Sequence, residues 1–234
     1  MIIGINGKIG SGKDTVGSII QYLTDKNVTT ETFEFWYASN FYSVYQSVGM
    51  FQIKKFAGKL KQIASLLTGI DVEKFEDQEF KKLEMPECWN RLQQSGRSKV
   101  WVPMTYRQFL QELGTEAMRE GLHTNVWVNA LFADYKESPQ NVLGNEGYKL
   151  EDVYPNWIIT DMRFPNEMEA VIEKGGITIR VVRPGTSTGT HPSEIALDGH
   201  TMHYEIINDG TIEDLIEKVK EILIKENIIN NSRL

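Results

Sequence analysis

The stretch "GKIGSGKDT" (residues 7–15) constrains the fold of this chain more than any other feature, because it directly follows the short apolar run "MIIGI". Gly7, four residues and then Gly12-Lys13 form the G-x-x-x-x-G-K frame of a phosphate-binding loop, between a predicted strand and a predicted helix. Glycines in such a loop let backbone N–H groups and the helix N-terminus point at phosphate oxygens. The sequence therefore predicts a nucleotide-binding α/β protein, with Lys13 reaching the β- and γ-phosphates.

The residue after Lys13 departs from the usual motif, which has a serine or threonine there to help hold Mg²⁺. Asp14 could hold the ion directly or through water, and Thr15 lies one residue further along. The alternative is that Asp14 is a favourable anion in the first turn of a helix, worth ~0.3–1 kcal/mol. We take Asp14 and Thr15 as candidate metal ligands.

Composition excludes several classes of protein. The chain has 234 residues, of which 41% are hydrophobic and 24% are charged, as in a globular protein with a core. A single cysteine, Cys88, excludes an internal disulfide and favours a cytoplasmic protein. The net charge of −7 argues against polymeric nucleic acid as a partner. No apolar run is long enough to cross a bilayer, so we expect no membrane partner.

Predicted strands and helices alternate along the chain. Strands are expected at 1–5, 51–57, 157–161, 177–182 and 204–208. Helices are expected from 13 to about 26, at 58–69, from 105, over about 124–137, at 165–174 and from 211. Between them we expect strands or a hairpin at 28–50, charged helical pieces and loop at 71–104, a polar loop at 138–156 and a mobile loop at 184–203. This alternation predicts a parallel sheet with helices on both faces.

Missing motifs narrow the class of nucleotide enzyme. The sequence has no N-K-x-D motif for reading a guanine base, and its buried strand "WIITDMR" ends in Asp161-Met162-Arg163 rather than Asp-Glu. A GTPase and a motor or AAA-type ATPase are therefore disfavoured. A small phosphotransferase is the remaining expectation.

Two further segments carry candidate binding residues. In "TYRQFLQELGTE" (105–116), Thr105 and Gln108 form a capping box. At 100° per residue, the apolar stripe of that helix carries Phe109, Leu110, Leu113 and Ala117. A second face carries Arg107, Gln111, Gly114 and Thr115, where the glycine leaves a gap for a flat ligand or the face is simply solvated. Asp161 and Arg163 follow a buried strand, at the sheet edge where open α/β folds bind ligands.

Several segments together resemble one known family. "GKIGSGKDT", "FAGKLKQIA", "YRQFLQELGTE", "DMRFPNE", "RVVRPG" followed by "HPSE", and "NDGT" stand in the same order as in the bacteriophage deoxynucleoside monophosphate kinases. The resemblance covers most of the chain, and Asp14 agrees with it. Poorly matched are 28–50, 84–104 and 138–156.

The resemblance implies a P-loop kinase that transfers the ATP γ-phosphoryl group to a deoxynucleoside 5′-monophosphate, with Mg²⁺. It implies a single kinase domain with an acceptor-binding excursion over about 55–137, a lid over about 184–203, and a possible homodimer. The ATP phosphates would lie at Gly10, Ser11, Gly12, Lys13, Asp14 and Thr15. The acceptor would lie at Lys61, Lys81, Arg107, Gln111, Gly114, Thr115, Trp127, Asp161, Arg163 and Glu167. The groups close to the transfer would be Lys13, Asp14, Asp161 and the lid residue Arg183.

Two alternatives remain open at this point. One is a P-loop kinase for another small acceptor, such as the phosphomevalonate type, which also accepts a G-K-D loop. The other is a catalytically idle nucleotide-binding module that regulates a partner. The H-P-S-E element at 191–194 either belongs to the lid or caps a turn through Ser193.

Overall fold

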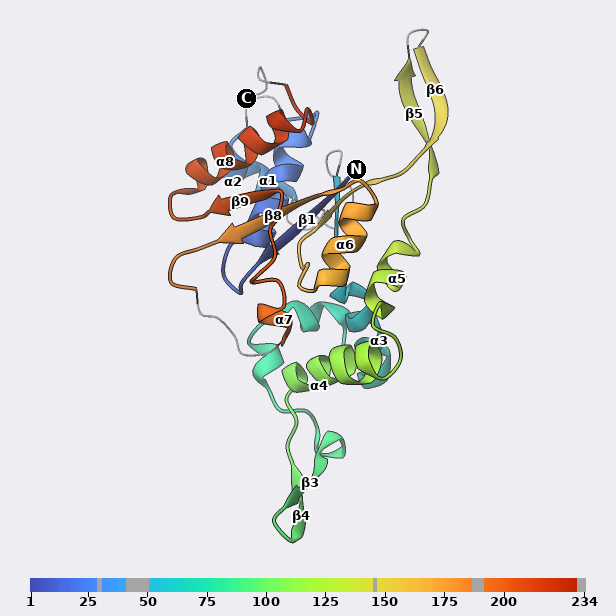
Figure 1. Cartoon of the computed structure of the whole chain (residues 1–234), viewed down its shortest axis with the longest axis vertical. Helices are drawn as coiled ribbons and strands as arrows, with labels where there is room; N and C mark the ends of the chain where they lie inside the picture. Colours follow the sequence, from blue (N-terminus) through green and yellow to red (C-terminus); the bar gives the residue numbers. More distant parts are fainter. Residues whose placement is uncertain (29–30, 41–50, 145–146, 187–191, 231–234) are drawn as a thin grey trace. The chain divides into compact units, whose positions relative to one another are not determined.

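The computed structural model describes residues 1–28, 31–40, 51–144, 147–186 and 192–230. The chain divides into two compact units. The first comprises Met1–Lys55 and Phe132–Leu234, and the second comprises Phe56–Leu131. The labels in Figure 1 follow the chain through both units.

The first unit is built on a five-stranded parallel sheet of order β2-β7-β1-β8-β9. Its strands β1, β8 and β9 are labelled in Figure 1. Its strands are β1 (Ile2–Gly7), β2 (Phe51–Lys54), β7 (Asn156–Ile159), β8 (Ile177–Val182) and β9 (Tyr204–Ile207). Parallel strands that are buried on both faces appear in a sequence as short continuous apolar runs, which is why all five were predicted. The α/β fold of the P-loop kinase class is thereby confirmed.

Helices cover both faces of this sheet. Ile3 and Ile5 of β1 share a core with α1 (Lys13–Thr24), α2 (Phe33–Asn40) and α8 (Ile212–Lys225). Gly4 faces the other way, and a Cβ there would lie 3.3 Å from Val171 of α6 (Pro165–Glu173). The side chains of a strand alternate between its faces, so β1 contributes to both layers. The helix expected from 211 is α8, and Thr211 caps it with its hydroxyl, which accepts a hydrogen bond from Asp214 N at 3.2 Å.

The prediction of strands or a hairpin at 28–50 was wrong for its described part. Residues Phe33–Asn40 form helix α2 instead. Phe33 and Trp36, three residues apart, are both buried, and Trp36 Nε1 donates a hydrogen bond to Asp25 Oδ2 at 3.0 Å. The helical spacing of the two aromatic residues outweighs their strand propensity. Residues 29–30 and 41–50 lie outside the described part of the chain.

The polar loop expected at 138–156 was also wrong. Its residues form an antiparallel hairpin of β5 (Ser138–Gly144) and β6 (Gly147–Val153), joined by residues 145–146 outside the described part. The backbone ladder pairs Ser138 with Val153 at one end and Gly144 with Gly147 at the other. A hairpin of this kind is held by its backbone ladder, so a polar sequence does not prevent it.

The second unit has a smaller core of its own. Its main helices are α3 (Ala57–Thr68), α4 (Tyr106–Glu112) and α5 (Val126–Phe132), whose last residue belongs to the first unit. Short 3₁₀ turns lie between them: η1 (Val72–Glu76), η2 (Phe80–Lys82) and η3 (Glu87–Trp89). The core consists of Ala64, Phe75, Met85, Met104, Tyr106, Phe109 and Leu110. The capping box of Thr105 and Gln108 is confirmed, and Gly69 ends α3 with a φ of 72°.

Two features of the second unit were not predicted. A hairpin of β3 (Arg91–Ser95) and β4 (Ser98–Val102) replaces part of the charged segment expected at 71–104, and Trp101 in it is 67% exposed. After α4 the chain continues as a π-helix, η4 (Leu113–Glu120). Its i→i+5 hydrogen bonds change the angle per residue, so the stripe expected at 100° does not continue. Ala117, predicted on the apolar stripe, is therefore exposed.

The loop expected at 184–203 contains a short helix, α7 (Pro192–Ile195), while residues 187–191 lie outside the described part. Arg180 of β8 donates hydrogen bonds to the carbonyls of Leu197 and His200, at 2.6 and 2.9 Å. Leu197 is 2% exposed. Among the helices in the described part of the chain, none combines the length and apolar character that a bilayer crossing needs.

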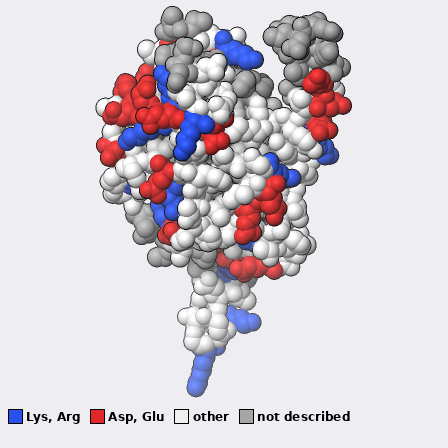
Figure 2. Space-filling model, turned by 45° about the horizontal axis from the view of Figure 1, so that its top comes forward, with Lys and Arg blue, Asp and Glu red and all other residues white. Residues whose placement is uncertain are grey.

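Charges of both signs are mixed on the face shown in Figure 2. There the Lys and Arg side chains of the described residues lie scattered among Asp and Glu, with no continuous basic field. The charged side chains of the described residues on this face are therefore mixed rather than separated by sign.

Candidate functional site

The loop between β1 and α1 has the backbone of a phosphate cradle. Gly10 and Gly12 have φ values of 79° and 94°, a region that residues with a Cβ avoid. Gly7 is also needed, because a Cβ there would lie 2.4 Å from Ser11 Oγ and 2.8 Å from the Val181 carbonyl. A hydrogen bond from Ser11 N to the Lys8 carbonyl, at 3.1 Å, closes the turn of the loop before α1 begins.

One buried group of the loop lacks a partner within the described structure. Ser11 is fully buried, and its hydroxyl has no hydrogen-bond partner among the described residues. Buried hydroxyls are normally satisfied, and an exception calls for an explanation. A phosphate oxygen at the N-terminus of α1 would supply the missing partner, so the loop fits a bound phosphate group.

Lys13 lies at the first position of α1 and is partly withdrawn from water. Burial lowers the pKa of its side chain below the ordinary range. The carboxylates of Asp14, Glu194 and Asp161 favour its ammonium form, and Arg163 opposes it. Its Nζ lies 3.5 Å from the Lys8 carbonyl, which is the long limit of a hydrogen bond. A desolvated ammonium group interacts more strongly with an anion than an exposed one does.

Asp14 is held in place by residues that follow two strands. Thr160, directly after β7, donates its hydroxyl hydrogen to Asp14 Oδ1 at 2.9 Å. Lys55, directly after β2, places its Nζ 3.5 Å from the same oxygen. Gly17 allows this approach, because a Cβ there would lie 2.7 Å from Thr160 Cγ2. The Asp14 side chain is still 63% exposed, so an ion can reach it.

Asp161 and Arg163 lie just past the C-terminal end of β7, where they were expected. Asn6 Nδ2 donates to the Met162 carbonyl between them at 2.9 Å and so fixes this turn to β1. The Arg163 guanidinium forms an ion pair with the carboxylate of Glu194 in α7. Both Asp161 and Arg163 act electrostatically on Lys13, so three of the predicted residues share one site.

Glu167 has a structural role in the described protein. It is 2% exposed, and its Oε2 accepts hydrogen bonds from the backbone N–H groups of Arg163 and Phe164, at 2.7 and 3.1 Å. This carboxylate therefore caps α6 and fixes the backbone of Arg163. Arg183, after β8, is exposed, and its carbonyl accepts from the Thr186 hydroxyl at 2.8 Å.

The second unit holds the other predicted cations. Lys61 of α3 pairs with Glu76 Oε1 at 2.5 Å, and its side chain is only 12% exposed. Arg107 Nη2 donates to Gln78 Oε1 at 3.0 Å. Lys81 lies in η2 and is partly buried. The cations of α3 and α4 are thus each oriented by a side chain of the intervening segment.

The gap expected above Gly114 is filled from within the second unit. A Cβ at Gly114 would lie 2.9 Å from Leu60 Cδ2, so the glycine permits α3 to pack against η4. Trp127 is 4% exposed, and its Nε1 donates to the Gly114 carbonyl at 2.8 Å. Gln111 and Thr115, the other polar residues of the predicted face, are partly buried. Binding roles for these residues stay predictions.

Comparisons with known proteins identify the family. A family model described as deoxynucleotide monophosphate kinase matches residues 53–219. The chain belongs to this family. The resemblance inferred from the motifs is thereby confirmed, although the phosphate-binding loop itself precedes the matched range.

Individual relatives agree with that assignment. A putative deoxynucleotide monophosphate kinase of Acanthamoeba polyphaga mimivirus is 27% identical over 229 residues, which is 94% of each chain. A deoxynucleoside-5′-monophosphate kinase of Escherichia phage T5 is 23% identical over 240 residues, or 89% of each chain. The deoxynucleotide monophosphate kinase of Enterobacteria phage T4 is 32% identical over 118 residues, half of this chain and 44% of that one.

Sequence reasoning missed three residues of the phosphate site. Neither Lys55 nor Thr160 was singled out as a candidate site residue from the sequence. Asn208, which follows β9, donates from Nδ2 to the Ser11 carbonyl at 2.9 Å and braces the loop. All three directly follow the C-terminal end of a strand of the parallel sheet. That position in the fold is the signal that could have found them.

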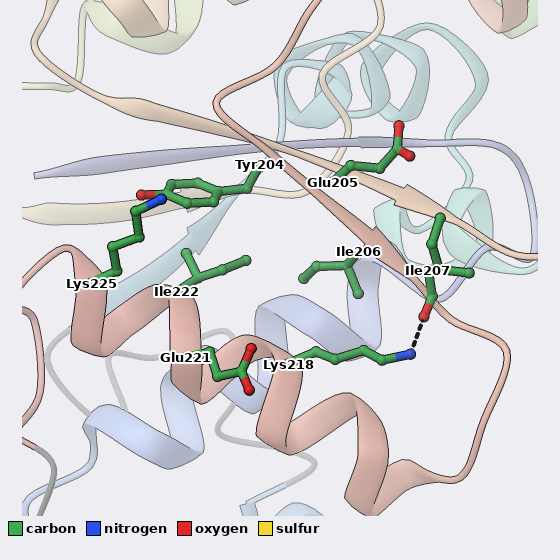
Figure 3. Close-up of a pocket in the computed structure, with 8 residues that line it drawn as sticks. All are labelled: Tyr204, Glu205, Ile206, Ile207, Lys218, Glu221, Ile222 and Lys225. Atoms are coloured by element: carbon green, nitrogen blue, oxygen red, sulfur yellow. Dashed lines mark hydrogen bonds between the residues drawn. The ribbon is translucent and has the colours of Figure 1, made fainter.

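A separate groove of about 470 Å³ lies between β9 and α8 (Figure 3). Lys218 on its wall donates to the Ile207 carbonyl at 2.6 Å and to Asp209 at 2.9 Å. Lys225 lies over the Tyr204 ring, 5.0 Å from its centroid. Both ammonium groups are thus engaged within the chain, and the groove does not include the phosphate-binding loop.

Proposed function

We propose that ATP, with Mg²⁺, is the donor in the family's reaction, the transfer of a phosphoryl group to a deoxynucleoside 5′-monophosphate. The products are a deoxynucleoside diphosphate and ADP. The observation that carries the donor assignment is the loop from Gly7 to Lys13, with its two left-handed glycines and its unpartnered Ser11 hydroxyl. This arrangement is that of the phosphate-binding loop in nucleotide kinases.

The donor phosphates are assigned to residues 10–15. Backbone N–H groups of the loop and of the α1 N-terminus would contact them, and Lys13 would contact the β- and γ-phosphates. Lys13 then stabilises the negative charge that shifts during transfer. Its low exposure to water makes that stabilisation larger than at an open surface.

Mg²⁺ is assigned to Asp14, with Thr15 beside it. The described residues contain no group of three metal-ligating side chains, and Mg²⁺ in kinases is commonly held by one or two carboxylates and by phosphate oxygens. The bound ion would neutralise phosphate charge. The protein's contribution is to orient Asp14, whose Oδ1 accepts a hydrogen bond from the Thr160 hydroxyl.

The phosphate of the acceptor is assigned to three cations, Lys61, Arg107 and Lys81. Glu76 pairs with Lys61, and Gln78 accepts a hydrogen bond from Arg107. Gln111 and Thr115 would contact the rest of the acceptor. Trp127 and Gly114 would shape the surface of the acceptor site through their packing. Glu167 would act by fixing the backbone of Arg163. Asp161 would border the acceptor and the metal.

Phosphoryl transfer requires positioning and neutralisation of charge more than covalent chemistry. The protein has an overall negative charge, so its site cations must be placed individually. Arg183 is assigned to the transferring phosphate when the segment around 184–203 closes. Closure would exclude water and so limit ATP hydrolysis. The homodimer implied by the resemblance stays a prediction.

The test is ADP production from ATP and Mg²⁺ with each of several candidate acceptors: dGMP, dTMP, dCMP, the corresponding ribonucleotides, and phosphomevalonate. At least one deoxynucleoside monophosphate should raise ADP release above the acceptor-free rate. Release at background level with every nucleotide would exclude the proposed reaction. Activity with phosphomevalonate alone would assign the protein to the other kinase type.

A further inference from the structure

A cluster of opposite charges next to the phosphate-binding loop includes Glu194, which is not among the site residues assigned above. Glu194 lies in α7, its side chain is only 11% exposed, and its carboxylate pairs with the guanidinium of Arg163. It is also one of the carboxylates whose charge acts on Lys13. Glu194 therefore pairs with Arg163, which follows β7, and its charge also acts on Lys13 of the loop.

The loop itself holds the segment that carries Glu194. Lys8 donates hydrogen bonds from its Nζ to the Glu194 carbonyl and to Asp198 Oδ1. Lys8 belongs to the variable positions of the G-x-x-x-x-G-K frame. Lys8 therefore holds the α7 segment, and with it Glu194, next to the phosphate-binding loop.

We propose that the Glu194 carboxylate substitutes for a phosphate group in the nucleotide-free protein, and that the ATP phosphates displace it from Arg163 when they bind. This inference rests on the proposed function, since it assumes that a triphosphate enters the loop. Arg163 is then released to contact the phosphoryl group or the acceptor. Glu194 is a positioning residue in this account, because it acts through Arg163.

Charge explains why Arg163 has a favourable anionic partner both before and after the nucleotide binds. Burying cations without a counter-charge is costly, so a carboxylate stabilises the empty site. A phosphate group carries more negative charge and more acceptor oxygens than a carboxylate, so it forms the stronger pair with a guanidinium. The carboxylate must be released first, which reduces the apparent affinity for the nucleotide.

The test is equilibrium binding of ATP to Glu194→Gln, measured by calorimetry without acceptor. Glutamine keeps the size of the side chain and removes the charge. Because the pair is partly exposed, we expect the Kd for ATP to fall by about fivefold. Adenosine, which has no phosphate, should bind the variant and the wild-type protein equally.

Asp198→Asn is the matched control. Asp198 lies on the same segment and pairs with the loop residue Lys8, but it is not among the carboxylates that act on Lys13. Its removal should change the Kd for ATP by less than about twofold. Equal tightening in both variants would contradict a specific exchange, because net charge alone would explain it.

Further outcomes separate this inference from the proposed function. If the wild-type protein binds ATP and Glu194→Gln binds it equally or more weakly, the exchange is refuted while the kinase assignment stands. If the wild-type protein does not bind ATP, the proposed function fails and the exchange fails with it. Tighter ATP binding by Glu194→Gln alone, without a change for adenosine, supports the exchange.

Discussion

Replacing Gly12 by alanine perturbs the phosphate-binding loop in two separable ways. The residue has a φ of 94°, which a side chain with a Cβ adopts only under strain. The new Cβ would also lie 2.5 Å from Asn208 Nδ2, which donates to the Ser11 carbonyl. The amide is the end of a side chain and can turn away, so the second cost is the loss of that hydrogen bond.

The two costs can be estimated and compared with a control. A left-handed backbone costs a residue with a Cβ about 1–2 kcal/mol. A lost hydrogen bond adds about 0.5–1.5 kcal/mol. Gly175→Ala is the matched variant, because Gly175 lies in the same unit, has a φ of 71°, and no atom lies within 4 Å of its Cβ position. It should show the backbone cost alone.

The assay combines urea unfolding, followed by circular dichroism, with equilibrium binding of ATP. Gly12→Ala should lower the free energy of unfolding by about 0.5–1.5 kcal/mol more than Gly175→Ala does. It should also lose most ATP binding, whereas Gly175→Ala should bind ATP as the wild-type protein does. Equal destabilisation, with intact ATP binding in both variants, would refute the assigned role of the loop.

Three other predictions concern the site cations. Lys13→Ala should reduce kcat in the coupled ADP assay by ~10²–10³, as when one preorganised electrostatic donor is lost; a larger effect on KM than on kcat would contradict this. Burial lowers the pKa of Lys13 in the folded protein. At a pH below this folded-state pKa, the charged side chain therefore reduces the free energy of unfolding, and the cost disappears as the pH rises toward the unfolded-state pKa. Lys13→Met should therefore stabilise the nucleotide-free protein in urea unfolding at pH 7, with a smaller gain at pH 10; a gain that grows with pH would refute the cause. Arg107→Ala should raise KM for the monophosphate and leave KM for ATP near wild type, and the reverse pattern in steady-state kinetics would mean that the two ends of the site were exchanged.

The sheet and the phosphate-binding loop were predictable because buried elements leave a strong pattern. Parallel strands such as β7 are apolar on both faces, and the caps of α4 and α8 use side chains at fixed spacing. The β3–β4 hairpin has no such pattern. All five residues of β3 are exposed, so no alternation of polar and apolar residues marks it.

The site was predictable in part for the same reason. The motif located Lys13 and Asp14, and the end of β7 located Asp161 and Arg163. Local spacing does not reveal partners that are distant in the chain: Thr160 reaches Asp14 across 146 positions, and Asn208 reaches Ser11 across 197. The π-helix was likewise not encoded in the 100° periodicity, so Ala117, which was expected on the apolar stripe, is exposed.

Transfer of label from ATP to a deoxynucleoside monophosphate tests the central claim most directly. The protein is mixed with Mg²⁺, ATP that is radiolabelled in its γ-phosphoryl group, and a mixture of deoxynucleoside monophosphates, and the products are separated by chromatography. The account predicts label in a deoxynucleoside diphosphate, at a rate that falls by ~10²–10³ in Lys13→Ala. Label found only in inorganic phosphate, or transferred equally fast by the variant, would contradict it.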